Sequence, residues 1–197
     1  MLLADPTGQG CLENLSLGGF VRYILIRLLF LPTLAWNVLL GRVLRIRRWW
    51  DVVDDRLLIG ALPFWWDAKR LAREGVTGVI NMCVEYKGPQ QSYARLGIDQ
   101  LWLPTTDFTP PALADVERGV AFISAHIDNG GKVYVHCKAG RGRSATVVVC
   151  WLIQEKGVSP EEAAASLTRC RPHVNKQLQN RDVVRAFYRK HVDASSQ

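Results

Sequence analysis

The sequence lacks cysteines at paired spacings. Five cysteines are scattered through 197 residues, an odd number with neither the regular spacing of a disulfide framework nor the close Cys and His pairs of a zinc site. A disulfide-stapled secreted domain and a zinc-binding domain are therefore excluded. This cysteine usage suits a reducing, intracellular compartment.

The sequence also has a deficit of acidic residues and no nucleic-acid-binding signature. Its formal net charge is +7 and its pI is about 9.4, which predicts an anionic partner such as nucleic acid, an acidic membrane surface or a phosphorylated substrate. No RNA-recognition motif, helix-turn-helix, internal repeat or low-complexity tract accompanies the charge. We therefore expect no nucleic-acid partner.

The first twenty residues lack the features of a targeting segment. No arginine precedes Arg22, and Asp5 and Glu13 are acidic, so the segment is a poor match to a mitochondrial transit peptide. No small-residue cleavage site follows the apolar stretch, which argues against a secretory signal. Organelle import by another route stays open.

One long apolar stretch is present, over residues 20–40. It contains 16 apolar residues of 21 and would reach about 30 Å as a helix, long enough to span a bilayer. Because Arg22, Arg27 and Pro32 interrupt it, a helix lying in the membrane interface competes with a crossing. A helix docked on the protein's own apolar surface is the third alternative.

The residues after this stretch favour contact with lipid headgroups. Basic side chains attract anionic headgroups, and tryptophans prefer the boundary zone of a bilayer. The run contains Arg42, Arg45, Arg47, Arg48, Trp49 and Trp50. We therefore expect residues 1–48 to be a membrane-associating extension.

The most informative segment is His136-Cys137-Lys138-Ala139-Gly140-Arg141-Gly142-Arg143-Ser144. Residues 133–135 form a short β-branched and aromatic strand, and residues 144–153 are apolar enough for a buried helix. Cys137 would then face a helix N-terminus, which favours a thiolate or a bound phosphoryl group. Gly140 and Gly142 let the loop curl with its amides inward, and Arg143 offers a planar fork to two phosphate oxygens.

This loop resembles the signature of the cysteine-dependent phosphatases, in their compact dual-specificity branch. The resemblance covers about residues 50–191 and implies an α/β fold with a central mixed sheet flanked by helices. We divide the chain into the apolar helical extension at 1–48, a phosphatase domain at 49–191 and a tail at 192–197. The nucleophile would be Cys137, with Arg143 as its phosphate-binding partner.

Periodicity predicts the elements of this domain. Strands are expected at 57–61, 78–82 and 98–103, and helices at 67–74 and 112–128. The last third is helical, with a capping box and an N1 proline in Ser159-Pro160-Glu161-Glu162 and a further helix near Asn180.

A phosphatase of this type also needs an acid to protonate the leaving oxygen. Asp107 lies on a turn-rich loop 30 positions before Cys137, where this branch carries its acid, and loops on a rigid scaffold often bear such groups. Asp99, on a predicted strand, and Asp115, on a predicted helix, are the alternatives.

The other loop residues have supporting roles. His136 is expected to hold the loop or tune the thiolate, and Ser144 to donate a hydrogen bond to the departing thiolate or cap the helix. The substrate-binding loop comprises Lys138, Ala139, Gly140, Arg141, Gly142 and Ser144. Cys83, Cys150, Cys170 and Cys11 are expected to be passive.

A second resemblance narrows the substrate. Residues 58–63, 78–82 and 159–163, with Glu85 and Tyr86, look like the mitochondrial protein-tyrosine-phosphatase-like lipid phosphatases, which convert phosphatidylglycerophosphate to phosphatidylglycerol on the route to cardiolipin. That family has Glu-Glu-Tyr-Glu after the second strand. Here only Glu85 and Tyr86 match, so substrate positioning by these two residues is a hypothesis.

These resemblances imply a phosphomonoester hydrolase that uses neither a metal nor another cofactor. We expect a phosphorylated lipid substrate, an anionic membrane surface as partner and an intracellular location at the mitochondrial inner membrane; the oligomeric state stays open. Lys138 and Arg141 would contact the lipid's second phosphate. A dual-specificity protein phosphatase, a phosphoinositide phosphatase, an RNA 5′-triphosphatase and a non-enzymatic phosphate-binding module are the alternatives.

Overall fold

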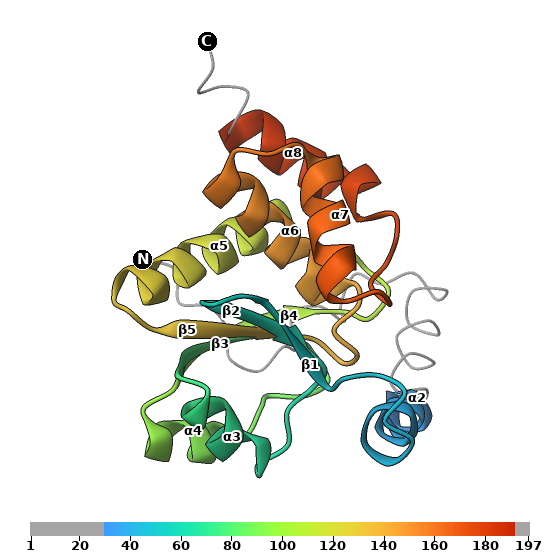
Figure 1. Cartoon of the computed structure of the whole chain (residues 1–197), viewed down its shortest axis with the longest axis vertical. Helices are drawn as coiled ribbons and strands as arrows, with labels where there is room; N and C mark the ends of the chain where they lie inside the picture. The colour runs from blue at the N-terminus through green and yellow to red at the C-terminus, as the bar shows by residue number, and fades with distance from the viewer. Residues whose placement is uncertain (1–29, 192–197) are drawn as a thin grey trace, which may run out of the picture.

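A five-stranded mixed sheet forms the centre of the protein (Figure 1). The structure is a computed structural model, and it describes residues 30–191. The strand order is β1-β2-β5-β3-β4, with β1 antiparallel to β2 and all other neighbours parallel. The strands are β1 (Trp50–Asp54), β2 (Leu57–Gly60), β3 (Val76–Cys83), β4 (Asp99–Thr105) and β5 (Lys132–His136).

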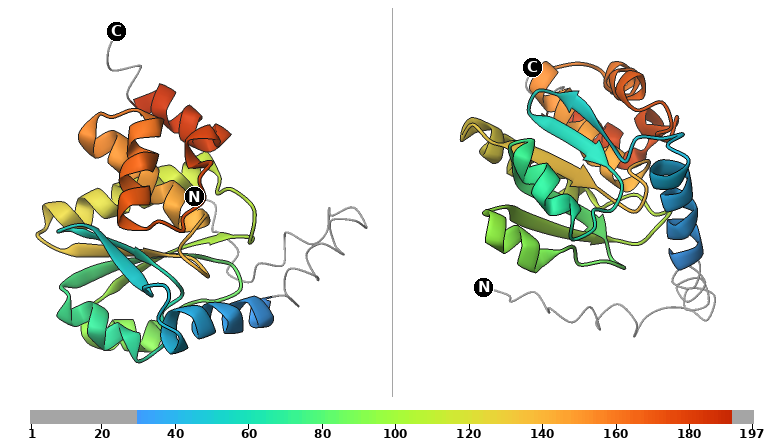
Figure 2. Two further views of the ribbon diagram at one scale, coloured as in Figure 1. Left: turned by 45° about the vertical axis from the view of Figure 1, so that its right-hand side comes forward. Right: turned by 60° about the horizontal axis from the view of Figure 1, so that its bottom comes forward.

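Helices cover both faces of this sheet, as the views in Figures 1 and 2 show. On one face lie α3 (Asp67–Arg73) and α4 (Gln90–Leu96). On the other lie α5 (Leu113–Asp128), α6 (Arg143–Lys156), α7 (Pro160–Cys170) and α8 (Asp182–His191), with the short 3-10 helix η3 (Leu178–Asn180). The predicted α/β class, with a mixed sheet between helices, is confirmed.

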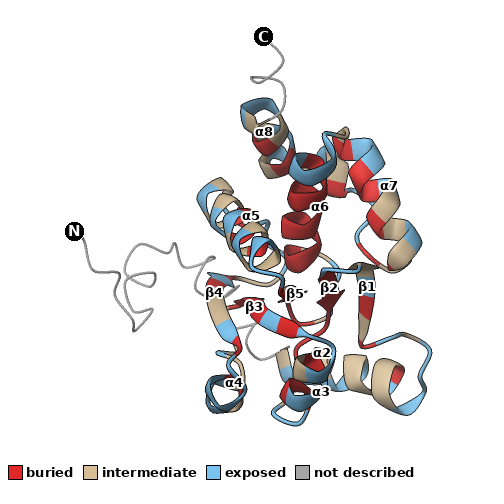
Figure 3. Ribbon diagram, turned by 60° about the vertical axis from the view of Figure 1, so that its left-hand side comes forward, coloured by how far each residue is buried: buried red, intermediate tan, exposed pale blue. Residues whose placement is uncertain are grey.

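Helix α6 is the centre of the larger core. Every residue from Arg143 to Ile153 is buried, and Figure 3 shows the helix enclosed by its neighbours. A helix that is apolar on all sides must be surrounded by protein. Since β5 is also buried between β2 and β3, the loop joining β5 to α6 is fixed at both ends by the best-packed parts of the fold.

A separate helical segment stands beside the ends of the strands (Figure 2). It consists of α2 (Phe30–Val38) and the π-helical turn η2 (Leu39–Val43). Within residues 30–191 no helix combines the length and the apolar character that a bilayer crossing requires. The first half of the apolar stretch, residues 20–29, lies outside the described residues.

The described part of the extension contacts the domain. Arg42 forms an ion pair with the buried Asp67, and its guanidinium lies 4.4 Å from the centre of the Trp49 ring. Trp49 is only 8% exposed and donates its indole N–H to Leu62 O. The prediction that Trp49 faces a headgroup zone is therefore wrong, because this ring is buried against the domain. Trp50 is half-buried at the start of β1.

Candidate active site

The loop from Cys137 to Arg143 joins β5 to the first turn of α6. Gly140 has φ +66°, and a Cβ atom there would lie 2.4 Å from the carbonyl oxygen of Gly60. Only glycine can adopt this left-handed conformation so close to the neighbouring backbone. The loop is thus pressed against the end of β2, with its curvature set by one obligatory glycine.

A buried arginine holds this loop from outside. Arg171, 1% exposed, donates from Nε to Gly140 O at 2.8 Å and from Nη2 to Ala139 O at 3.0 Å. It also forms a 2.5 Å ion pair with Asp51 of β1. Because these carbonyls point outward to Arg171, the intervening amides are free to point inward, as an anion-binding nest requires.

Cys137 lies at the floor of this loop. It is 4% exposed, and Ser144 Oγ donates to its Sγ at 3.3 Å. Burial raises the pKa of the thiol, but the Arg143 charge, the Ser144 hydroxyl and backbone N–H groups of Ser144 and Arg141 outweigh it and bring the pKa to about 7. A large fraction of Cys137 is therefore thiolate at neutral pH, the form that acts as a nucleophile.

Arg143 is the buried cation beside this thiol. Its Nη1 donates to Thr105 O at 2.6 Å and to Glu85 Oε2 at 3.2 Å, and its Nη2 lies 3.0 Å from Asp107 Oδ1. Burial lowers the pKa of Arg143, but the surrounding thiols and carboxylates raise it by more than burial lowers it. Arg143 therefore stays charged. The buried Nε has no partner among the described residues, a donor that a phosphoryl oxygen would satisfy.

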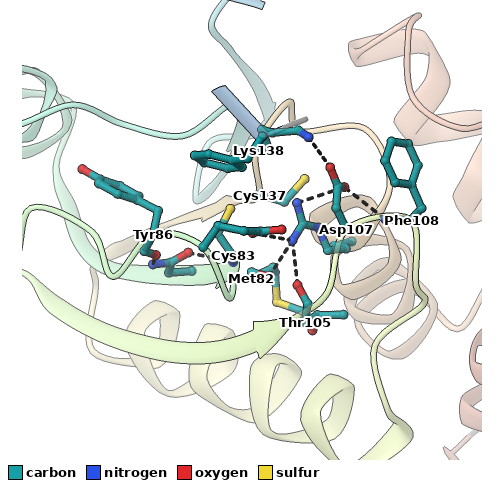
Figure 4. Close-up of polar contacts among 12 residues, drawn as sticks. Met82, Cys83, Tyr86, Thr105, Asp107, Phe108, Cys137 and Lys138 are labelled. Carbon is teal, nitrogen blue, oxygen red and sulfur yellow. Dashed lines mark hydrogen bonds and ion pairs between the residues drawn. The ribbon is translucent and has the colours of Figure 1, made fainter. Parts of the chain in front are cut away.

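Asp107 lies between two cations. It follows β4 by two residues and forms ion pairs with Arg143 and Lys138. In Figure 4 the Asp107 carboxylate and the Lys138 ammonium meet beside the Cys137 side chain. The next residue, Phe108, has φ +62° and is 77% exposed. The acid loop therefore brings a carboxylate beside the thiol and an aromatic ring to the surface.

Glu85 and Tyr86, the two residues after β3 that were predicted to position the substrate, point in different directions. Glu85 reaches Arg143, and its side chain is 4% exposed. The ring of Tyr86 points away from Cys137 (Figure 4), and its hydroxyl donates to Pro63 O at 2.8 Å. Burial raises the Tyr86 pKa to about 12. In this structure Tyr86 ties its loop to the one before α3, while Glu85 enters the site.

His136 supports the loop from the sheet side. It is fully buried and stacks on Tyr134, with ring centres 5.7 Å apart. Burial lowers its pKa to about 3. A backbone hydrogen bond with Cys137 opposes this effect, and the Arg143 charge makes a still smaller contribution that lowers the pKa. His136 is therefore neutral and does not compete with Arg143 for an anion.

The two basic loop residues point to different places. Lys138 is 6% exposed and donates to Thr33 Oγ1 of α2 at 2.9 Å in addition to its ion pair with Asp107. Arg141 turns away from Cys137 and donates from Nε to His173 O at 2.7 Å. Gly142 caps α6, and its carbonyl accepts from Arg181 at 3.3 Å.

Three contributors were not found from the sequence: Thr33, Arg171 and Arg181. Each reaches the loop from a segment distant in the chain, and the sequence offers no local signal for such contacts.

The two alternative acids pair with residues outside this cluster. The carboxylate of Asp99 is 80% exposed and lies 3.9 Å from His126, and Asp115 pairs with Arg118.

We expect iodoacetamide to alkylate Cys137 with a rate that rises through a pH of about 7, because only the thiolate reacts. Ser144→Ala removes a donor to the thiolate, so the midpoint should move to higher pH. Mass spectrometry of the Cys137 peptide across a pH series measures this. Cys150 serves as the internal control, since burial raises its pKa. An unshifted midpoint in Ser144→Ala would contradict the role of the hydroxyl.

Comparison with known proteins agrees with this geometry. The dual specificity phosphatase catalytic domain family matches residues 66–190. Phosphatidylglycerophosphate phosphatase PTPMT2 of Arabidopsis thaliana is 40% identical over 166 residues, covering 83% of this chain and 73% of the relative. Phosphatidylglycerophosphatase and protein-tyrosine phosphatase 1 of Rattus norvegicus is 39% identical over 175 residues, covering 84% and 91%.

Solved structures show the same similarity. The crystal structure of PTPMT1 superimposes with a TM-score of 0.68 at 37% identity, covering 75% of this chain and 99% of that one. A PTPMT1 structure in complex with PI(5)P also gives 0.68, at 36% identity, covering 76% and 100%. The resemblance inferred from the motifs is confirmed: the chain belongs to the dual specificity phosphatase family, and it is a cysteine-dependent phosphatase.

Proposed function

We propose that this phosphatase removes the terminal phosphate of phosphatidylglycerophosphate at an intracellular, anionic membrane, releasing phosphatidylglycerol for cardiolipin synthesis. The observation that carries the proposal is the contact of the apolar helix α2 with the phosphate loop, through Thr33 and Lys138. Relatives that are phosphatidylglycerophosphate phosphatases support this choice of substrate. The mitochondrial inner membrane is proposed from the resemblance to mitochondrial lipid phosphatases alone.

In the first step, the Cys137 thiolate attacks phosphorus while Arg143 and the loop amides bind the non-bridging oxygens. Binding of the phosphoryl group at Arg143 exchanges the Arg143–Asp107 ion pair for contacts with phosphate. Asp107, released from that pair, takes up a proton from solvent, turns toward the leaving glycerol oxygen and gives the proton to it. The products are a cysteinyl-phosphate and the alcohol of phosphatidylglycerol.

In the second step, water attacks the cysteinyl-phosphate. Asp107, now a carboxylate, takes a proton from the water, and the Sγ–P bond breaks. Ser144 Oγ, 3.3 Å from Sγ, donates to the leaving thiolate, and inorganic phosphate departs. Lys138 is near enough to Asp107 to stabilise its carboxylate form in this step.

An exposed apolar surface beside the loop supports action at a membrane. Nine of the eleven exposed large apolar side chains in the described part of the chain belong to the segment from α2 to the start of α3. One of the nine, Val52, lies on strand β1 and is not grouped with the others. We define this apolar face as Leu31, Trp36, Leu39, Val43, Leu44, Ile46, Trp65 and Trp66. Apolar patches of this kind mark contact surfaces for protein or membrane.

An open groove of about 470 Å³ borders the apolar face and shares Leu31, Leu39 and Val43 with it. The residues lining it are Leu31, Leu34, Ala35, Val38, Leu39, Val43 and Phe64. Phe64 connects the two parts of the face, because it stacks on Trp66 with ring centres 4.8 Å apart. The opposite side of α2 carries Thr33, which contacts the phosphate loop. One helix thus has a lipid-compatible side and a catalytic-loop side.

A substrate panel tests the proposal. We expect kcat/KM for phosphatidylglycerophosphate to exceed that for a phosphotyrosine peptide by about tenfold or more, the effect of one additional charge-assisted contact. A phosphoinositide is the second candidate, because a solved PTPMT1 structure is a complex with PI(5)P. Faster turnover of the peptide than of either lipid would assign the chain to protein phosphatases.

Asp107→Asn should lower the rate on phosphatidylglycerophosphate by about 10²- to 10⁴-fold, because glycerol is a poor leaving group that needs a proton. An aryl phosphate leaves more easily, so its loss should be smaller. Asp115→Asn is the matched control, since Asp115 pairs with Arg118. Equal losses on both substrates would remove Asp107 from the role of acid.

Replacing Trp36 and Trp65 together by alanine should weaken binding to anionic vesicles by roughly tenfold or more, because each ring loses apolar burial in the bilayer. The side chains are 59% and 67% exposed, so folding should be unaffected. Val52→Ala, at a residue 55% exposed on β1, is the control. Co-sedimentation measures the change, and equal binding by all three proteins would contradict membrane contact through this face.

A further inference from the structure

A basic cleft lies on the outer side of the phosphate loop. It is formed where three segments meet: the extension, the loop itself and the turn after α7. Its lining includes Arg47 and Arg48 from the extension, Ala139 and Arg141 from the loop, and Arg171 and His173 from the turn. In this structure the lining side chains leave about 10 Å³ of accessible space. A group larger than one water therefore enters only when the exposed side chains of Arg48 and Arg141 move aside.

The positive charge around this cleft is poorly compensated. Of its four arginines, only Arg171 has a carboxylate partner within residues 30–191, and that partner is the buried Asp51. Arg141 donates to a backbone carbonyl, which carries no net charge. Like charges brought together cost free energy unless an anion joins them.

The titration behaviour of the lining groups reflects this crowding. Burial lowers the pKa of Arg141, and the nearby charges of Arg47 and Arg171 lower it further. Burial and then the charges of Arg171, Arg47 and Arg141 lower the pKa of His173 to about 4. Three residues from three segments therefore interact electrostatically across the cleft.

The cleft is close to the catalytic loop but separate from the Cys137 thiol. Thr33 of α2 contacts Lys138, and Asn37, one turn further along, lines the cleft; that turn corresponds to about 6 Å along the helix axis.

We propose that this basic cleft binds a second phosphate group, one that is not hydrolysed. Arg47 and Arg141 supply its hydrogen bonds, and Arg171 fixes the loop behind it. The assignment moves the second-phosphate contact expected for Lys138 to Arg47, because Lys138 is engaged by Asp107 and Thr33. It rests on the proposed function only for the identity of a two-phosphate substrate.

Two sources can supply this phosphate. It is either the phosphodiester of phosphatidylglycerophosphate itself or the headgroup of a neighbouring anionic lipid. The chemistry of recognition is the same, since both present a singly charged phosphodiester to guanidinium groups. Soluble and bilayer measurements distinguish them.

Arg47→Gln is the test variant, and Arg45→Gln is its control. Both remove one charge from the same segment, but Arg45 is exposed and does not line the cleft. In full-length Cys137→Ser protein, calorimetry would compare short-chain phosphatidylglycerophosphate with short-chain phosphatidic acid, which has one phosphate. We expect about tenfold tighter binding of the two-phosphate lipid, lost in Arg47→Gln and kept in Arg45→Gln.

Vesicles of phosphatidylcholine with phosphatidylglycerol give the second arm. If Arg47→Gln weakens only vesicle binding, and by more than Arg45→Gln does, the phosphate comes from a neighbouring headgroup. If both variants have equal effects in both measurements, the cleft contributes only general charge and the proposal is overturned. Lack of phosphatidylglycerophosphate hydrolysis by the natural protein would refute the proposed function, while the binding comparison would still decide the cleft.

Discussion

The outward orientation of the phosphate-loop carbonyls is the constraint on which the site depends. A loop can offer its amides to an anion only if its carbonyls have hydrogen-bond donors elsewhere. Arg171 donates to the carbonyls of Ala139 and Gly140. The guanidinium is itself neutralised by Asp51 of β1. Removing one partner from such a buried pair typically costs about 3–5 kcal/mol. The edge strand and the turn after α7, far apart in the chain, are thus joined through the back of the catalytic loop.

The charge balance on the inner side of the loop follows from the same design. Arg143 and Lys138 are both nearly buried, and they face Asp107, Glu85 and the Cys137 thiol. Buried charges persist only when paired. A dianionic phosphoryl group adds negative charge, so it is tolerated only if a carboxylate changes its partner or gains a proton. This requirement couples substrate binding to release of Asp107, the group that we propose protonates the leaving oxygen.

The sequence predicts what is local and fails where contacts are distant. The loop, its strand and its helix were predicted because their signals are contiguous, over residues 133–153. The capping box of α7 is formed as expected. Strand β1 was missed because Trp49 and Trp50 were interpreted as headgroup contacts, and α4 because its seven residues carry no capping side chain. No pattern could indicate that Arg171 would be buried, since arginine is usually exposed and its partners come from other segments.

The position of α2 connects the proposed membrane contact with the phosphate loop. One side of this helix contributes Thr33 to Lys138, and the opposite side lines the apolar groove. Lys138 in turn pairs with Asp107. A lipid that displaced or tilted α2 would therefore alter the surroundings of Lys138 first and Asp107 second, through two direct contacts. The helix that is suited to lipid contact is thus also connected, through Lys138, to the residue proposed as the general acid.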